Sequence, residues 1–381
     1  MVKLGEVCTI VSGTTPKSTQ PEYWDGDLNW VTPAELTEES NVIYESQRKI
    51  TQQAVIDSSL KSFPAGTVLL SSRAPIGKVA IAGTEMYCNQ GFKNLICSEK
   101  IYNRYLYHYL KSKAEYLNSL GRGATFKEIS KAIVENIEIP LPPLAEQRKI
   151  AAALDKVSDL IAKRRQQLTK LDELIKARFV EMFGDEHQFD KWHCTSVGEI
   201  ADICVGVVIK PTQYYTDNCG IPAFRSLNIG TMAVKNSDWV YFTKEGHEKN
   251  KKSVIKENDV LVVRSGAPGT ACVATKEFEG YNAIDIIIAH PNFEKINPIF
   301  LAMFTNMAHG MNQIRGKTGG AAQQHFNVSG YKSLTVILPP IELQNQFAFF
   351  VEQTEKTKTT ISHSLEKLEI LKNALMQEYF G

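Results

Sequence analysis

The sequence predicts an α+β fold in which two mixed, β-rich domains are separated by two long helices that form an antiparallel coiled coil. Three observations predict this fold. Residues 141–184 and 338–381 align without gaps at an offset of 197, and thirteen of these forty-four positions are identical. Each copy carries an apolar seam whose spacing alternates between three and four residues. Short β-branched runs separated by turn residues fill the remaining chain. The duplication predicts an internal pseudo-twofold repeat.

The offset divides the 381 residues into four segments. We expect globular domains over residues 1–140 and 185–337, and helical spacers over residues 141–184 and 338–381. Each spacer opens with a proline pair, which suits the first turn of a helix because proline has no N–H to leave unpaired. Each closes on a glycine, a common helix stop. Between these signals lie about 36 residues without proline or glycine, enough for a helix of roughly 50 Å.

The seam of each spacer is interrupted by charged residues at different places. Its first copy reads Ile150, Leu154, Val157, Ile161, Arg164, Leu168, Leu171, Ile175, Arg178 and Met182, and its second reads Phe347, Val351, Thr354, Lys358, Ile361, Leu365, Leu368, Lys372, Leu375 and Tyr379. Arginines interrupt the first seam where the second keeps Ile and Leu, and lysines interrupt the second where the first keeps Ile. This complementarity favours intramolecular pairing over self-association. The alternative is that each helix covers only its own domain.

The globular segments read as irregular, β-rich domains. Strands are expected at the β-branched runs Thr67–Leu70, Val79–Ala82, Val260–Val263 and Ile284–Ile288. Helical patterns are expected over residues 101–118 and 297–315. The two segments match each other in their framework more than in the residues that decorate it. Two copies of one scaffold with different loops are suited to binding two different targets.

Composition excludes several classes of protein. A hydrophobic fraction of 43% and a charged fraction of 22% are typical of a globular protein. No apolar run approaches the length of a membrane span, and no signal core opens the chain. The seven cysteines form no CxxC pair, so we expect reduced thiols, a cytoplasmic location and no metal site. The net charge of +1 does not by itself indicate a nucleic-acid binder, although a local basic surface is compatible with it.

Candidate DNA-binding residues lie on two kinds of basic loop. The first kind is a short turn between strands, and the second is a glycine-rich stretch before each spacer. Arginine can bond a guanine edge, glutamine can read adenine, and lysine can hold phosphate. The loops could equally be an ordinary hairpin and a flexible linker. The candidates are Arg73, Lys78, Arg122, Lys127, Arg264, Lys317, Gln323 and Gln324.

The aromatic clusters and histidines favour packing over chemistry. Trp24 and Trp30, like Tyr214 and Tyr215, could stack on bases, but core packing is the stronger expectation. The histidines show no spacing typical of metal ligands. Signatures of a nucleophilic serine and of a methyltransferase are missing from the sequence. We therefore expect a chain without catalytic residues and without a cofactor of its own.

Taken together, these motifs closely resemble the specificity subunit of type I restriction–modification systems. The resemblance rests on Leu-Pro-Pro followed by Gln147 and by Gln344, each leading into a long helix. The tract from Trp24 to Trp30 and the Ala-Pro-Ile-Gly loop ending at Gly77 also resemble that family's target-recognition domains. The second copy departs at Leu343, where the first has a glutamate.

The resemblance implies a non-catalytic DNA-recognition subunit. Each target-recognition domain would read one half of a bipartite, asymmetric sequence in double-stranded DNA. The helices would set the spacing and dock two modification (methyltransferase) subunits, and restriction subunits would join for cleavage. S-adenosylmethionine, ATP and Mg²⁺ would belong to those partners. The alternatives are a specificity subunit of a related system with a fused modification and cleavage partner, a coiled-coil structural adaptor, and a free-standing enzyme.

Overall fold

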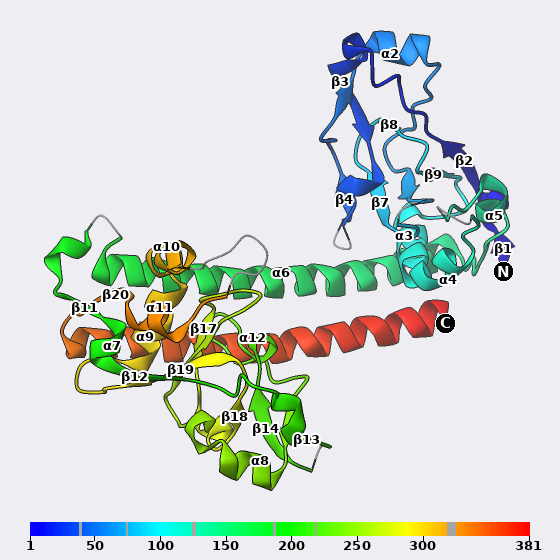
Figure 1. The fold of residues 1–381 in the computed structure, drawn as a ribbon. Coiled ribbons are helices and arrows are strands. Elements are labelled where there is room, and N and C mark those ends of the chain that lie inside the picture. Colours follow the sequence, from blue (N-terminus) through cyan, green and yellow to red (C-terminus); the bar gives the residue numbers. More distant parts are fainter. Residues whose placement is uncertain (38–39, 74, 124–126, 186–187, 218, 318–324) are drawn as a thin grey trace. The chain divides into compact units, whose positions relative to one another are not determined.

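The computed structural model describes residues 1–381 apart from 38–39, 74, 124–126, 186–187, 218 and 318–324. It divides into two compact units. Unit 1 comprises Met1–Gln167 and Ile361–Gly381, and unit 2 comprises Leu168–Thr360. Each unit therefore combines one β-rich domain with a part of each long helix (Figure 1). This arrangement confirms the predicted α+β class.

The described residues of the globular part of unit 1 form three sheets and five short α-helices. The first sheet has the strand order β2 (Cys8–Ser12), β9 (Lys93–Cys97), β6 (Val68–Leu70), β7 (Val79–Ala82), β4 (Val42–Ile43). The second has the order β5 (Lys49–Ile50), β3 (Trp24–Val31), β8 (Tyr87–Cys88). The third pairs β1 (Val2–Lys3) with β10 (Glu138–Ile139). The helices are α1 (Leu4–Val7), α2 (Gln52–Asp57), α3 (Asn103–Ser112), α4 (Ala114–Ser119) and α5 (Lys131–Glu135). Strands β6 and β7 pair antiparallel, and β4 joins β7 in parallel.

The described residues of unit 2 repeat this plan, with sheets of four, four and two strands where those of unit 1 have five, three and two. The first sheet has the strand order β12 (Ala201–Val205), β19 (Ile286–Pro291), β16 (Val260–Val263), β17 (Ala271–Val273). The second has the order β13 (Tyr215–Thr216), β15 (Val240–Phe242), β14 (Ile221–Phe224), β18 (Asn282–Ala283). The third pairs β11 (Cys194–Ser196) with β20 (Thr335–Ile337). The short helices of unit 2 are α7 (Val197–Ile200), α8 (Lys244–Lys249), α9 (Pro298–Asn306), α10 (Ala308–Lys317) and α11 (Val328–Lys332). The predicted internal repeat is therefore present in three dimensions.

The predicted bounds of individual strands and helices are confirmed in part. Strands β7 and β16 have the predicted bounds, whereas the predicted strand at 284–288 is shifted to β19. Each long helical pattern is broken into two helices, after Ser112 in unit 1 and after Asn306 in unit 2. The backbone of Met307 is extended (φ −71°, ψ 160°), and that of Lys113 leaves the helical region (φ −105°, ψ 18°). Neither break has a proline or a glycine at it.

The two long helices are α6 (Leu144–Phe183) and α12 (Ile341–Phe380), each of 40 residues. All ten predicted seam positions on each helix are buried or half-buried. In unit 1, Arg165 of α6 bonds Glu369 of α12 at 2.9 Å. In unit 2, Asp172 of α6 bonds Lys358 of α12 at 2.7 Å. Since residue numbers rise along α6 as they fall along α12, the pairing is antiparallel and intramolecular, as predicted.

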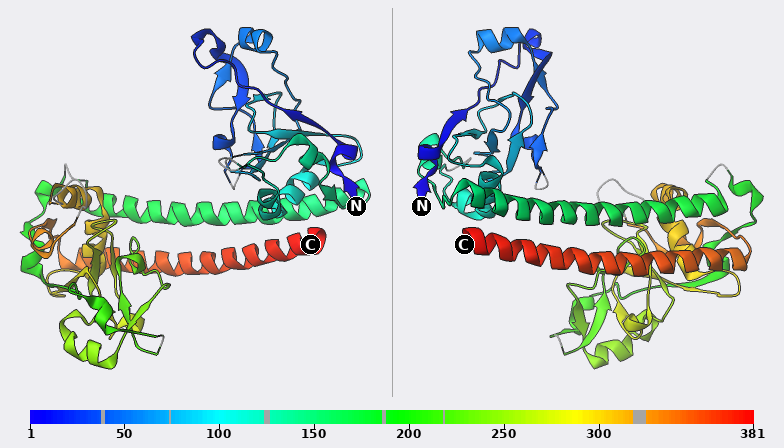
Figure 2. Two further views of the ribbon diagram at one scale, coloured as in Figure 1. Left: turned by 45° about the vertical axis from the view of Figure 1, so that its right-hand side comes forward. Right: turned by 180° about the vertical axis from the view of Figure 1, so that it is seen from behind.

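The end of α12 is part of the core of unit 1. Phe380 is buried, and its ring meets Tyr105 and Tyr109 of α3 edge-on, at centroid distances of 5.3 and 5.6 Å. Ile150 and Leu154 of α6 belong to the same cluster. Both views in Figure 2 show this end of α12 beside the first turns of α6. The first domain is therefore closed by the last helical turns of the chain.

A buried glutamine fixes the start of α6. The side chain of Gln147 is fully buried, and its Oε1 accepts a hydrogen bond from the backbone N–H of Tyr102 at 2.8 Å. Its Nε2 donates to the carbonyls of Pro142 (2.8 Å) and Lys100 (3.1 Å). The side chain thus ties together the segment before α3, the proline turn and the first turn of α6. This explains why a glutamine stands at a fixed distance after the proline pair.

Unit 2 contains the same anchor. Gln344 is fully buried and accepts from the N–H of Asn297 at 2.9 Å. It donates to the carbonyls of Pro339 (2.8 Å) and Lys295 (3.3 Å). The carboxylate of Glu146 in the first copy is exposed, which accounts for its replacement by Leu343 without loss of the anchor. Among the described residues, no helix is both long and apolar enough to cross a membrane.

Candidate nucleic-acid interface

The turn after β6 has a defined hairpin geometry. Ser71 and Lys78 are joined by a hydrogen bond from the Ser71 N–H to the Lys78 carbonyl at 2.9 Å, and the Gly77 N–H donates to the Ser71 carbonyl at 3.0 Å. Gly77 has a φ of +96°, a conformation that favours glycine over residues with a side chain. The Ser71 hydroxyl accepts from the Lys78 N–H at 2.8 Å. The described ends of the loop are therefore joined as a hairpin.

The turn after β16 has the same frame with other side chains. The N–H of Val263 donates to the carbonyl of Thr270 at 2.9 Å, and that of Gly269 donates to Val263 at 3.0 Å. Gly269 has a φ of +91°. The equivalent of Lys78 is thus a threonine, so the frame is kept while its charge and reach differ between the units.

In unit 1 the glycine-rich loop lies directly against this turn. The N–H of Ile129 donates to the carbonyl of Ser72 at 3.0 Å, and Arg122 and Glu128 exchange two backbone hydrogen bonds of 3.0 Å. The buried ammonium of Lys93 bonds the Glu128 carboxylate at 3.0 Å and the Ser72 hydroxyl at 3.3 Å. The two basic loops that were predicted separately therefore form one surface.

Unit 2 brings its two loops together by the same backbone bond. The N–H of Phe326 donates to the carbonyl of Arg264 at 3.0 Å, and the Arg264 Nε donates back to the Phe326 carbonyl at 3.1 Å. The guanidinium of Arg264 is buried and forms an ion pair with Asp285. The hydroxyl of Ser265 and the ring of His325 share a further hydrogen bond. A buried cation thus holds the loops in each unit, a lysine in one and an arginine in the other.

The structure places the predicted site residues in different surroundings. Arg122, Lys127 and Lys317 are exposed, and Arg73 and Lys78 are half-buried. The Lys317 ammonium donates to the Ser333 hydroxyl at 2.9 Å. Arg264 is engaged internally, so in this conformation its guanidinium supports the loops. Gln323 and Gln324 lie outside the described residues.

The aromatic clusters pack as core elements. The rings of Trp24 and Trp30 meet edge-on at 5.1 Å, and Trp30 is 2% exposed. The guanidinium of Arg48 lies 3.7 Å from the centre of the Trp24 ring. Tyr214 and Tyr215 both pack against Phe242. This agrees with the stronger expectation of packing. Among the described residues, no group of three or more His, Cys, Asp or Glu is arranged to hold a metal ion.

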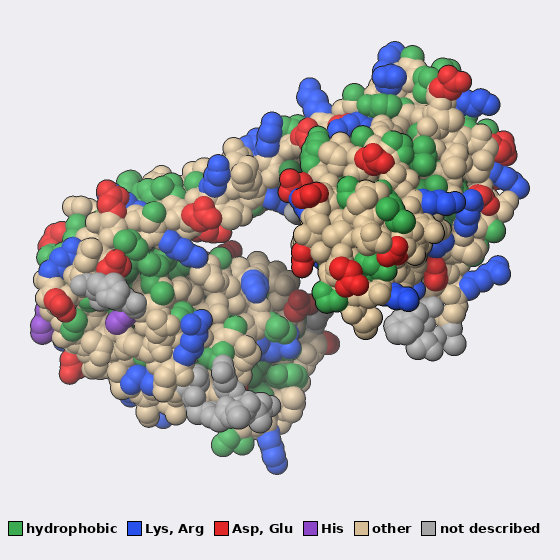
Figure 3. Space-filling model, turned by 90° about the horizontal axis from the view of Figure 1, so that it is seen from above, with side chains coloured by type: hydrophobic (Ala, Val, Ile, Leu, Met, Phe, Trp, Pro, Cys, Tyr) green, Lys and Arg blue, Asp and Glu red, His purple; other side chains and the backbone are tan. Residues whose placement is uncertain are grey.

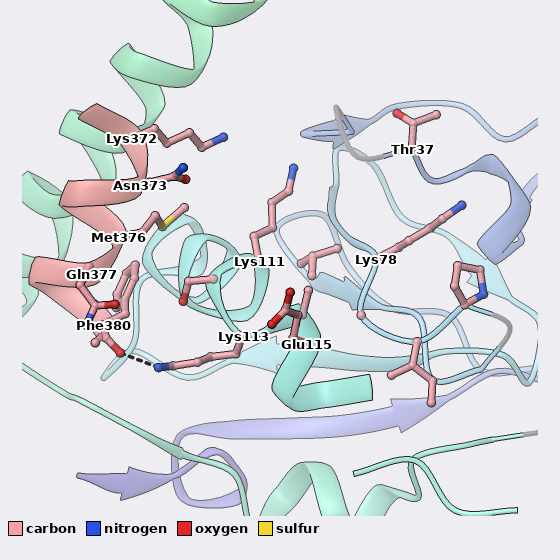
Figure 4. Close-up of a pocket in the computed structure, with 17 residues that line it drawn as sticks. Thr37, Lys78, Lys111, Lys113, Glu115, Lys372, Asn373, Met376, Gln377 and Phe380 are labelled. Carbon is pink, nitrogen blue, oxygen red and sulfur yellow. Dashed lines mark hydrogen bonds between the residues drawn. The ribbon is translucent and has the colours of Figure 1, made fainter. Parts of the chain in front are cut away.

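A cavity of about 660 Å³ lies beside the Ser71–Lys78 turn in unit 1 (Figure 4). Residues 75–79, the junction of α3 and α4, and the last turns of α12 line it. Lys78, Lys111 and Lys372 reach it from three elements. Sequence reasoning did not select Lys111 or Lys372 as site residues. Lys372 did leave a signal, because it interrupts the apolar seam of α12.

The distribution of charge is mixed at larger scale. On the face seen in Figure 3, basic and acidic side chains are interspersed over the described surface. Electrostatic attraction to a polyanion must therefore come from local groups of lysine and arginine rather than from the net charge of the molecule.

Comparison with known proteins decides the family. A family model described as "Type I restriction modification DNA specificity domain" matches residues 1–171 and again residues 190–370. The chain belongs to this family of specificity subunits. The two matches correspond to the two copies of the repeat, and together they span most of the chain.

Two named relatives of this chain are specificity subunits of type I restriction enzymes. The chain is 28% identical to the specificity subunit of the type I restriction enzyme MjaIX of Methanocaldococcus jannaschii, over 98% of this chain and 90% of that protein. It is 22% identical to the EcoKI specificity subunit of Escherichia coli K12, over 89% of this chain and 76% of that protein.

Two solved structures share the fold. The type I specificity subunit of M. genitalium superposes with a TM-score of 0.62 at 16% identity, covering all of this chain and 95% of the other. A chain from a structure on complex assembly and conformational transition of the type I system gives 0.58 at 19% identity, covering all of this chain and 96% of the other.

Proposed function

We propose that this specificity subunit reads a bipartite, asymmetric sequence in double-stranded DNA, with one β-rich domain on each half of the target. The observation that carries the proposal is the pair of loop surfaces. Each has the same backbone frame, held by the bond from Ile129 to Ser72 in one unit and from Phe326 to Arg264 in the other. The side chains on these frames differ. Two loop surfaces with the same backbone hydrogen bonds but different side chains are suited to reading two half-sites of different sequence.

The domain boundaries that we propose for this reading are residues 1–140 and 185–337 for target recognition, and residues 141–184 and 338–381 for the helical spacers. The exposed Arg122, Lys127 and Lys317 are proposed to meet DNA, together with Arg73 and Lys78. Gln323 and Gln324 remain proposed base readers. Arg264 is proposed to position its loop through Asp285 and the Phe326 carbonyl.

The paired helices are proposed to act as a spacer and as the docking surface for two modification subunits, with restriction subunits joining for cleavage. In this proposal the chain itself is not catalytic and acts in the cytoplasm. S-adenosylmethionine, ATP and Mg²⁺ would be bound by the partner subunits. The relatives that are themselves specificity subunits of type I restriction enzymes support this division of labour.

The test is selection from random duplexes by the complex reconstituted with its modification subunits. We expect enrichment of two short, different motifs at one fixed separation. Enrichment of a single motif, or of none, would refute bipartite reading. Methyl transfer by the purified chain alone would contradict a non-catalytic role, and a single partner that both methylates and cleaves would indicate the related fused system.

The spacer role has its own test. Seven residues are inserted into α6 after Arg165 and seven into α12 after Glu369, so that the seam stays in register. Seven residues lengthen a helix by about 10 Å, which corresponds to about three base pairs. We expect the selected separation to grow accordingly or binding to be abolished, because the half-sites also rotate about the duplex. Unchanged separation with unchanged affinity would exclude the spacer role.

A further inference from the structure

The lysine-lined cavity of unit 1 has the composition of an anion site. The described residues that line it include four lysines and one carboxylate side chain, Glu115. Three of these lysines have partners within unit 1. The Lys113 ammonium donates to the Phe380 carbonyl at 2.6 Å and caps the end of α12. That of Lys111 donates to the Tyr107 hydroxyl at 3.0 Å, and that of Lys78 to the Pro33 carbonyl at 3.5 Å. Figure 4 shows Lys372 and Lys111 extending into the same space from α12 and α3, with Lys78 on the opposite wall.

The two lysines in the seam of α12 differ in their surroundings. Lys358 bonds Asp172 and Glu355, both at 2.7 Å, so its charge is balanced within unit 2. Lys372 makes no hydrogen bond or ion pair with any residue that the structure describes in unit 1. Burial and the Arg165 guanidinium lower the pKa of Lys372, while Glu369 acts in the opposite sense. A half-buried ammonium without a partner is costly, and a bound anion would remove that cost.

The side chains that line the cavity also indicate which part of a nucleic acid it would bind. The cavity has lysines but no arginine among its described lining residues, and the one aromatic ring, that of Phe380, is buried. Lysine acts as a point charge that suits phosphate, and the amides of Asn373 and Gln377, which also line the cavity, can donate hydrogen bonds to phosphate oxygens. The excess of lysines therefore favours phosphate as the group that is bound.

We propose that Lys111 and Lys372, with Lys78 on the opposite wall, bind backbone phosphate of the DNA whose first half-site is read by the adjoining loops. The proposal rests on the proposed function and adds a role to it. Residues 75–78 line the cavity and also belong to the proposed reading loop, so phosphate held here would lie beside the bases being read. In this proposal, α12 binds DNA as well as acting as a spacer. Lys372, the charged residue that interrupts the apolar seam of α12, is one of the residues that bind phosphate.

The test measures the salt dependence of DNA binding by the reconstituted complex. Lys372→Gln, Lys111→Gln and Lys78→Gln are compared with Lys367→Gln, which removes an exposed lysine of α12 that does not line the cavity. For each phosphate that a variant no longer neutralises, the slope of log K against log salt should become less steep by about 0.9. Affinity for target and random duplexes should fall by equal factors, because phosphate carries no sequence information. Lys367→Gln should leave the slope unchanged.

Unaltered slopes in all three cavity variants would overturn the proposal. Lys372→Gln is the cleanest of the three, since it breaks no hydrogen bond or ion pair among the described residues, and its melting temperature should not fall. A wild-type complex without any sequence preference would refute the proposed function, yet the slopes on random duplexes would still decide whether these lysines bind phosphate.

A parallel arm uses inorganic phosphate, to separate a free anion from DNA as the source of the phosphate. If millimolar phosphate stabilised the wild-type chain but not Lys372→Gln, while the DNA slopes of the two were equal, the cavity would be a small-anion site and the DNA assignment would be wrong.

Discussion

Removing the buried amide of Gln344 tests the account of the helix anchor. In Gln344→Ala, the N–H of Asn297 and the carbonyls of Lys295 and Pro339 are left without their partner inside the protein. A hydrogen bond of this kind contributes about 1 kcal/mol net, and an unsatisfied buried group costs somewhat more. The absence of three such bonds should therefore destabilise unit 2 by about 3 kcal/mol. Gln346→Ala, two residues along the same helix and exposed, should stay within about 0.5 kcal/mol of the wild type.

Urea unfolding of the full chain measures the overall change in stability, and amide hydrogen exchange at Asn297 locates it. A change of about 3 kcal/mol corresponds to about a hundredfold decrease in protection at that amide. Gln147→Ala should show the same decrease at the amide of Tyr102 in unit 1. If Gln344→Ala and Gln346→Ala unfolded alike, or if the Asn297 amide kept its protection, the anchor would not have the energetic role assigned to it.

Three further predictions concern single residues. Arg264→Ala should cost about 2–3 kcal/mol in urea unfolding, less than for a fully buried pair because Asp285 is 36% exposed; a change below about 0.5 kcal/mol would contradict the supporting role. The Asp259 carboxylate and the Cys204 thiol raise the pKa of His290 from about 6.5 to about 9, so its stabilisation is complete below pH 6.5 and is lost as pH rises through 9. The stability difference between wild type and His290→Gln should accordingly shrink by about 3 kcal/mol from about pH 6 to about pH 10, and a difference independent of pH would exclude this linkage. Gly77→Ala should lower stability by about 1–2 kcal/mol, because its φ of +96° disfavours a side chain; equal melting temperatures would show that the turn relaxes.

The sequence predicted the fold well where the signal was periodic or repeated. The seams of α6 and α12 follow from spacing alone, since a period of 3.5 residues fixes which side chains face the partner helix. The breaks at Lys113 and Met307 could not be predicted, because no proline or glycine at these positions marks them in the sequence.

The candidate DNA-binding residues remain a prediction, and the sequence did not show which partners hold the loops that carry them. Both basic loops were found from their composition, yet nothing local shows that Glu128 would pair with Lys93 or that Asp285 would pair with Arg264, since each pair is joined only by the fold. An arginine that reads a base and an arginine that holds a loop look alike in a sequence. Lys372 illustrates the converse, because a charged residue in an apolar seam was visible while the cavity that it enters was not.

The docking of Phe380 against α3 has a consequence for how the chain is made. Tyr105 and Tyr109 are synthesised long before the turn of α12 that covers them. Until that turn of α12 has left the ribosome, the first domain therefore exposes an apolar surface that is only later buried. Shortening α12 at its end should accordingly unfold the domain at the beginning of the chain and spare the domain that immediately precedes the helix.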